Sequence, residues 1–209
     1  EIQKLAHVQS ASVERDRENG RLIMKVVQRQ PVAWIECPRL KLFPALSGRG
    51  YMLDAEGVVL PCEVLTRSYL ALPTIRFEGL SQAEAGAPIP DLQVRAALEL
   101  LAGLKGRFEN DFDQVKRIDI PAPYALVTTF ADGAKVTFSV DEIDGALARF
   151  DRIRREGKAR HWQIATLNLI PKRNVPITFQ SEPDMTGLDR PTILLSSSEP
   201  PTAAPLDEP

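Results

Sequence analysis

The side chains that could do chemistry are few and far apart in this 209-residue sequence. The histidines are His7 and His161, and neither has a second histidine, cysteine or carboxylate at the spacing of a metal site. The cysteines, Cys37 and Cys62, do not form a C-x-x-C pair, and no serine occupies a G-x-S-x-G elbow. These residues therefore indicate no catalytic centre, metal site or cofactor, and we expect a protein that is not an enzyme.

Two short motifs could bind ions. Glu109, Asp111 and Asp113 could hold a cation, but they lack the regular Asp/Asn, Gly and Glu spacing of a calcium loop, so a solvated loop is favoured. Residues 48–50 (Gly-Arg-Gly) could be mistaken for part of a phosphate loop. They lack the full glycine pattern and a following helix, which favours a simple turn.

Composition excludes several classes of protein. The net charge of −2 argues against a general nucleic-acid binder, which neutralises phosphates with a basic surface. No run approaches the roughly 18 apolar residues that span a bilayer, and no signal peptide is visible. Because the chain begins at Glu1, without Met and within a helix-like pattern, we expect it to be a fragment of a longer protein.

The first elements predicted are a helix end and a β-hairpin. Ile2, Leu5 and Val8 have helical spacing. Alternating apolar residues predict strands over 10–16 and 21–35, with Asn19 and Gly20 supplying the turn between them. Pro31 has no N–H to donate to a strand ladder, so the second strand must end, bulge or lie at an edge there.

The rest of the chain to residue 180 predicts a mainly antiparallel β domain with two flanking helices, and an α+β fold class. A second hairpin is expected over 51–62, and a helix capped by Asp91 is expected to run to about Leu104, with Gly103 and Gly106 marking its end. The other predicted elements are strands at 115–120, 124–130, 135–140, 163–170 and 175–180, and a helix at 141–156. Residues 181–209 are rich in proline and are expected to be a flexible tail.

Two motifs carry a resemblance to a known family. Residues 10–15 (S-A-S-V-E-R) and 29–34 (R-Q-P-V-A-W) are followed by residues 54–57 (D-A-E-G) and an apolar run. This order resembles the FtsQ/DivIB cell division proteins, in which the second half of a POTRA domain precedes a β domain. The resemblance implies a partial POTRA domain at residues 1–36, an FtsQ-type β domain at 37–180 and a tail at 181–209.

The same resemblance implies a function. Such a protein would be a non-enzymatic scaffold of the divisome at the septum, with one upstream transmembrane helix in the inner membrane and this region in the periplasm. It would bind FtsB/FtsL-like partners through an exposed C-terminal edge strand. The implied partner-binding residues are Arg154, Arg155, Leu169, Val175, Ile177 and Phe179. The sequence departs from the family pattern at Asn168, where Asp is common, and at Pro176, which is expected to blunt one side of the edge.

Several alternatives stay open. Cys37 and Cys62 are either two buried free thiols or a disulfide, which an envelope location would permit. The cations on the 141–156 helix and just after it are either a solvated face near a helix C-terminus or a docking patch for an acidic partner. They are Arg149, Arg152, Arg154, Arg155, Lys158 and Arg160. A POTRA-bearing assembly or secretion factor is an alternative function, and an enzyme or small-ligand domain ranks below it.

Overall fold

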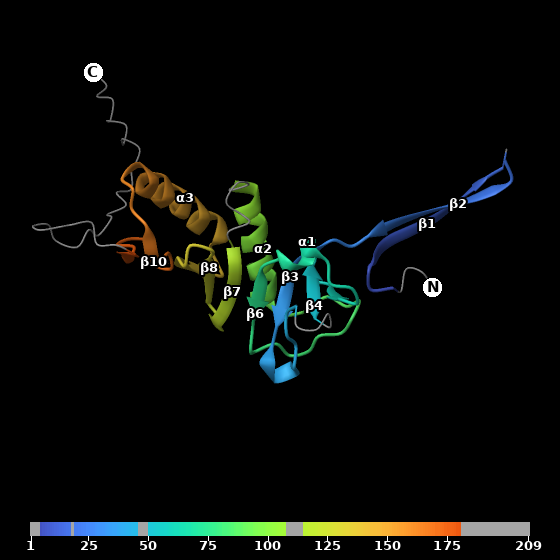
Figure 1. Cartoon of the computed structure of the whole chain (residues 1–209), viewed down its shortest axis with the longest axis horizontal. Coiled ribbons are helices and arrows are strands. Elements are labelled where there is room, and N and C mark those ends of the chain that lie inside the picture. Colours follow the sequence, from blue (N-terminus) through green and yellow to red (C-terminus); the bar gives the residue numbers. More distant parts are fainter. Residues whose placement is uncertain (1–4, 18, 46–49, 108–114, 181–209) are drawn as a thin grey trace, which may run out of the picture.

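The structure is a computed structural model that describes residues 5–17, 19–45, 50–107 and 115–180. It has an α+β fold, in which a two-stranded hairpin extends away from a larger body built on one sheet (Figure 1). The hairpin consists of β1 (Val8–Asp16) and β2 (Arg21–Gln28). The large sheet contains β3 (Pro31–Glu36), β4 (Tyr51–Asp54), β5 (Val59–Pro61), β6 (Thr74–Arg76), β7 (Val115–Ala122), β8 (Ala125–Phe130), β9 (Lys135–Ser139), β10 (Ile164–Asn168) and β11 (Ile177–Phe179). The helices are α1 (Arg67–Leu70), α2 (Leu92–Arg107) and α3 (Ile143–Ala159), with a 3-10 turn at Pro38–Leu40.

The large sheet has nine described strands in the order β11-β10-β9-β8-β7-β6-β3-β4-β5. Most neighbouring strands are antiparallel, which confirms the predicted sheet. The chain crosses from β6 to β7 through α2 and from β9 to β10 through α3, and both pairs are therefore parallel. The remaining parallel pair is β3 with β6, which places β3 in the middle of the sheet.

Helices α2 and α3 cover one face of the sheet and build the main core with it. They approach so closely that a Cβ added at Gly103 would lie 2.4 Å from Leu147 Cδ1. The prediction that Gly103 ends the first helix is wrong, because α2 continues to Arg107. Gly103 serves helix packing, since close contact with α3 requires a residue without a side chain.

A second, smaller core lies on the opposite face of β3, β4 and β5. Trp34 is its centre and is 1% exposed, and its indole Nε1 donates a hydrogen bond to the Tyr69 carbonyl oxygen at 2.7 Å. Cys62 belongs to this core, whereas Cys37 lies in the main core with α2 and α3. Both cysteines are buried free thiols in this structure and lie on opposite faces of the sheet. Of the two alternatives, the structure therefore has the free thiols and not the disulfide.

Two predictions at the start of the chain are wrong for the described residues. Residues 5–7 form a turn rather than a helix end, and Val8, whose N–H donates to the Leu5 carbonyl at 2.9 Å, begins β1. The strand predicted at 21–35 is two strands in two sheets, because β2 ends at Gln28 and β3 begins at Pro31. Proline cannot continue the ladder with β1, so the chain leaves the hairpin there.

Every residue of β2 is exposed, and an apolar row of the hairpin faces solvent in this structure. Val13 pairs with Met24, and Arg15 pairs with Leu22, so the exposed Leu22, Met24 and Val13 share one face. Two strands alone are only marginally stable in water. The hairpin is consistent with the implied half of a POTRA domain but does not establish one. None of the helices in the described ranges is both long and apolar enough to cross a bilayer.

Candidate functional site

The two edges of the large sheet are not equivalent. At the β5 edge, residues 85–89 run alongside the strand: Val59 N–H donates to the Ala87 carbonyl at 3.0 Å, and Gly86 N–H donates to the Val59 carbonyl at 2.8 Å. At the other edge, β11 pairs only with β10 among the described strands. An unpaired edge is a template for a strand from another chain, so β11 is the candidate site.

The backbone of β11 alternates between β10 and the open side. The Pro176 carbonyl accepts a hydrogen bond from Asn168 N–H at 3.0 Å, and Gln180 N–H donates to the Gln163 carbonyl at 2.7 Å. Because successive residues of a strand point their polar groups to opposite sides, Ile177 and Phe179 direct their N–H and C=O groups outward. The expectation that Pro176 blunts the edge is wrong, since the N–H that it lacks would have faced β10.

The side chains of Ile177 and Phe179 lie on the helix-covered face of the sheet. Ile177 is half-buried against the main core. Phe179 packs on Trp162, with ring centroids 5.0 Å apart, and Arg160 lies over the Trp162 ring at 4.7 Å. The edge therefore presents outward-facing backbone groups together with a half-buried aromatic and aliphatic pair, a combination suited to an extended apolar segment.

Gln180 and Thr178 hold the end of β11 in place. Gln180 Nε2 donates to the Asp132 carbonyl at 2.9 Å and to the Ile164 carbonyl at 3.2 Å. On the opposite face, the hydroxyls of Thr166 and Thr178 lie 2.7 Å apart. These contacts attach a three-residue strand to both β10 and the turn before β9.

The structure separates the six residues implied as partner-binding. Ile177 and Phe179 lie at the edge, as expected from chain order. Leu169 and Val175 are 0% and 1% exposed, so their side chains pack in the core and cannot touch a partner. Arg155 is exposed at the surface of α3, in an i,i+4 ion pair with Asp151.

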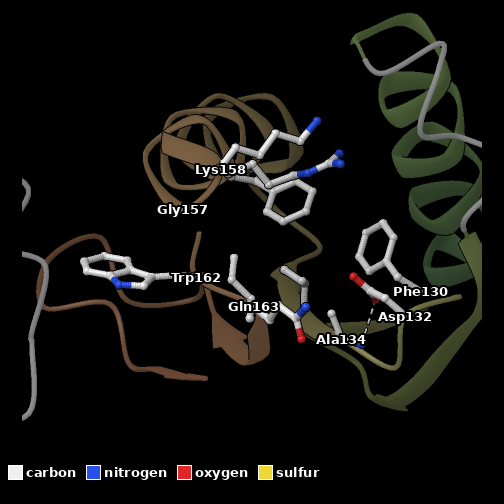
Figure 2. Close-up of a pocket in the computed structure, with 11 residues that line it drawn as sticks. Phe130, Asp132, Ala134, Gly157, Lys158, Trp162 and Gln163 are labelled. Atoms are coloured by element: carbon white, nitrogen blue, oxygen red, sulfur yellow. Dashed lines mark hydrogen bonds between the residues drawn. The ribbon is translucent and has the colours of Figure 1, made fainter. Parts of the chain in front are cut away.

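Arg154 belongs to α3 and lines a pocket of about 160 Å³. Figure 2 shows this pocket between the C-terminal part of α3, at Gly157 and Lys158, and the turn at Asp132, with Phe130 on one side and Trp162 on the other. Asp132 accepts a hydrogen bond from Ala134 N–H at 2.9 Å. Since Trp162 lines the pocket and also packs on Phe179, it connects the pocket with the edge.

The other candidate residues form no site in the described structure. His161 is exposed just after α3 with a φ of 56°, and its N–H donates to the Lys158 carbonyl, so it ends the helix. No group of three or more metal-ligating side chains occurs among the described residues. The acidic cluster predicted at 109–113 and the tail at 181–209 lie outside the described ranges, as do two residues of the 48–50 turn.

Sequence reasoning missed two residues of this region. Trp162 could have been found as the aromatic residue between a basic helix end and an alternating run. Arg149, which was placed on the outer face of its helix, has a side chain only 15% exposed and donates to the Leu169 carbonyl at 3.0 Å. It lies two helical turns after Glu142, and that seven-residue spacing is the signal that places both on one side of α3.

These features define an α+β domain whose large sheet has one open edge among the described residues. The family model described as "Cell division protein FtsQ/DivIB, C-terminal" matches residues 45–169. The chain therefore belongs to the FtsQ/DivIB family of membrane-anchored cell division scaffolds. A comparison with curated proteins gives no significant match. The matched range ends one residue after β10, so β11 lies beyond it.

Proposed function

We propose that this protein is the periplasmic part of an inner-membrane divisome scaffold that captures an FtsB/FtsL-like segment by strand addition to β11. Family membership supports the role in cell division. The observation that carries the capture mechanism is the outward direction of the Ile177 and Phe179 backbones, which follows from the inward bonds of Pro176 and Gln180. The role requires no catalytic group and no cofactor.

The captured segment would be extended and would form main-chain hydrogen bonds with Ile177 and Phe179. Its apolar side chains would continue the half-buried row of Ile177 and Phe179 beneath α3, and its acidic side chains would meet Arg155. Arg154 would contribute only where the partner reaches the pocket beside Trp162. Leu169 and Val175 would support the edge from inside.

We also propose a division of labour between the two sheets. The hairpin β1-β2 would belong to a POTRA-like unit that contacts other membrane division proteins, and the nine-stranded sheet would form the partner-binding unit. The border would lie at Arg29 and Gln30 rather than after residue 36, because the strand that follows, Pro31–Glu36, pairs with both β4 and β6. A transmembrane helix upstream of this region would anchor the protein.

A charge placed at Phe179 tests the capture mechanism. We expect Phe179→Asp to weaken binding of the purified periplasmic segment of the FtsB-like protein from the same cell by at least about tenfold, because a central aromatic contact is lost. Tyr124→Asp is the matched control, since Tyr124 is a 60% exposed aromatic in the turn between β7 and β8. Circular dichroism would establish that both variants fold, and equal binding by the two would refute the assigned edge.

Localisation tests the cellular role separately. We expect a fluorescently tagged full-length protein to concentrate at midcell in dividing bacteria, and the Phe179→Asp protein to lose its FtsB-like partner there. A uniform envelope signal from the unmodified protein would contradict the divisome role.

A further inference from the structure

Arg149 joins α3 to the connection between β10 and β11. Its guanidinium Nη2 donates a hydrogen bond to the Leu169 carbonyl at 3.0 Å, and Nη1 lies 3.6 Å from Glu142 Oε1. Leu169 is the first residue after β10, and its own N–H donates to the Thr137 carbonyl of β9 at 2.8 Å. The N–H of Leu169 is thus bound to the sheet, and its carbonyl is bound to helix α3.

A second contact ties the same connection to the beginning of α3. Lys172 Nζ lies 3.5 Å from Glu142 Oε2, so Glu142 stands between Lys172 and Arg149. Glu142 can fold back over the helix because Gly145 has no Cβ. A Cβ at this position would lie 2.8 Å from Glu142 Oε1. The helix beginning is therefore built to hold Glu142 beside the connection.

The connection determines where β11 lies. β11 has three residues and, among the described strands, pairs with β10 alone. Residues before it are fixed by the buried Leu169 and Val175 and by the Asn168 side chain, which accepts a hydrogen bond from Ile170 N–H at 3.0 Å. So short a strand has little stability of its own, and its register with β10 depends on these anchors.

Burying the charged Arg149 side chain between α3 and the connection costs free energy. Its Nε is buried and has no hydrogen-bond partner in the described structure. An apolar side chain would fill a similar volume without the cost of removing a charge from water. What an apolar side chain would not provide is the donor to the Leu169 carbonyl, and this donor is the specific contribution of Arg149.

We propose that Arg149 is a positioning residue for the partner-binding edge: through Leu169 it holds β11 in register with β10. The inference rests on the proposed function only for its consequence in binding. Arg149 lies in α3 and not in β11. Its hydrogen bond to the Leu169 carbonyl would act on β11 through the connection between β10 and β11.

Amide hydrogen exchange of the isolated protein tests this directly. We expect Arg149→Ala to speed exchange at the Gln180 amide, which donates to the Gln163 carbonyl just before β10, by about tenfold, the effect of losing one hydrogen bond from a charged donor. Arg149→Lys, which keeps the charge but not the fork, should recover part of the protection. Arg152→Ala is the control, because Arg152 is an exposed residue of the same helix.

The outcome is decided by comparison with an amide elsewhere in the sheet. Trp34 N–H in β3 donates to the Pro73 carbonyl at 2.8 Å, and its exchange should not change in Arg149→Ala. Equal acceleration at Trp34 and Gln180 would mean general destabilisation and would overturn the proposal. No acceleration at Gln180 would also overturn it.

Binding gives an independent second reading. We expect Arg149→Ala to weaken binding of the FtsB-like segment about as much as it raises opening of β11, because only the ordered edge binds. Full affinity in Arg149→Ala, with binding lost in Phe179→Asp, would overturn the positioning role while leaving the edge intact. If Phe179→Asp binds normally, the proposed function fails, and the exchange experiment alone decides whether Arg149 positions β11.

Discussion

Arg29 Nη1 lies 2.6 Å from Asp54 Oδ2 and joins the end of the hairpin to the turn between β4 and β5. The Asp54 side chain is only 6% exposed, and its other oxygen accepts hydrogen bonds from the N–H groups of Glu56 at 2.9 Å and Val58 at 2.8 Å. One carboxylate therefore shapes a turn of the large sheet and also holds the residue that follows β2. Arg29 Nη1 lies 2.7 Å from Glu56 Oε2 as well.

Replacing Asp54 should destabilise the protein strongly. In Asp54→Asn the amide would present a donor to Arg29, and a largely buried guanidinium would keep only Glu56, its exposed partner. We expect a loss of about 2–4 kcal/mol in the free energy of unfolding, measured with urea. Glu78→Gln removes an exposed partner of Arg76 and should cost less than about 1 kcal/mol. Similar losses in both variants would show that Asp54 has no structural role beyond a surface ion pair.

The contact at Glu56 should weaken in acid. Hydrogen bonds from Arg29 first, and then from Gln9, hold the pKa of Glu56 below its ordinary value. The pKa of Arg29 is raised, first by Glu56 and then by Asp54, so Arg29 stays charged throughout.

A carboxyl group with a lowered pKa in the folded protein stabilises the fold above its unfolded-state pKa, and this contribution is lost as the pH falls through the folded-state pKa. We therefore expect Glu56→Gln to be less stable than the parent near neutral pH and equal to it in strong acid. Urea titrations of both proteins across this range would measure the difference, and a constant difference at all pH values would contradict it.

The two glycines of α2 should respond in opposite ways to alanine. Gly103→Ala places a methyl group against Leu147 in the main core and should cost about 1–3 kcal/mol through overpacking. No described residue lies near the Cβ position of Gly106, so Gly106→Ala should stabilise the helix by up to about 1 kcal/mol. Thermal unfolding of both variants tests the close packing of α2 on α3, and two stabilised proteins would contradict it.

Two truncations should locate the border between the sheets. A chain that begins at Arg29 keeps β3 and should unfold cooperatively, because all of β2 is exposed in the longer chain. A chain that begins at Cys37 lacks β3, the strand between β4 and β6, and should fail to fold. Circular dichroism during urea unfolding would measure both, and loss of the fold in the first truncation would place the border elsewhere.

The cysteines should resist modification until the protein unfolds. Burial raises the pKa of the Cys62 thiol, which disfavours the reactive thiolate, and Cys37 is 0% exposed. We expect a thiol reagent at neutral pH to label neither residue in the folded protein and both after denaturation. Absence of labelling in denaturant without reductant would show that the two form a disulfide in the purified protein.

Much of the large sheet could be predicted from alternation and turn residues. The strands on either side of Gly133 are predictable because Asp132 and Gly133 separate two alternating runs, and that glycine has a φ of 88°. The break between β2 and β3 was less predictable. One strand was expected over 21–35, although Pro31 and the continuous apolar run at 32–35 indicate a separate strand that is buried on both faces.

The candidate site was predictable only in part. Chain order placed Ile177 and Phe179 at a sheet edge, because a last strand is a natural edge. Leu169 and Val175 were assigned to the same partner-binding surface, although both lie in the connection between β10 and β11 with their side chains buried in the core. Burial of this kind depends on packing against α3 and cannot be deduced from local alternation.

Closure of the β5 edge by residues 85–89 has a consequence for stoichiometry. Because the described sheet can grow only beyond β11, two copies of this domain cannot stack edge to edge into a continuing fibre. Strand addition at β11 would consume the single growing end and give a one-to-one complex. Closure of the β5 edge would therefore keep the protein from polymerising through the same kind of main-chain hydrogen bonds that are proposed to bind its partner.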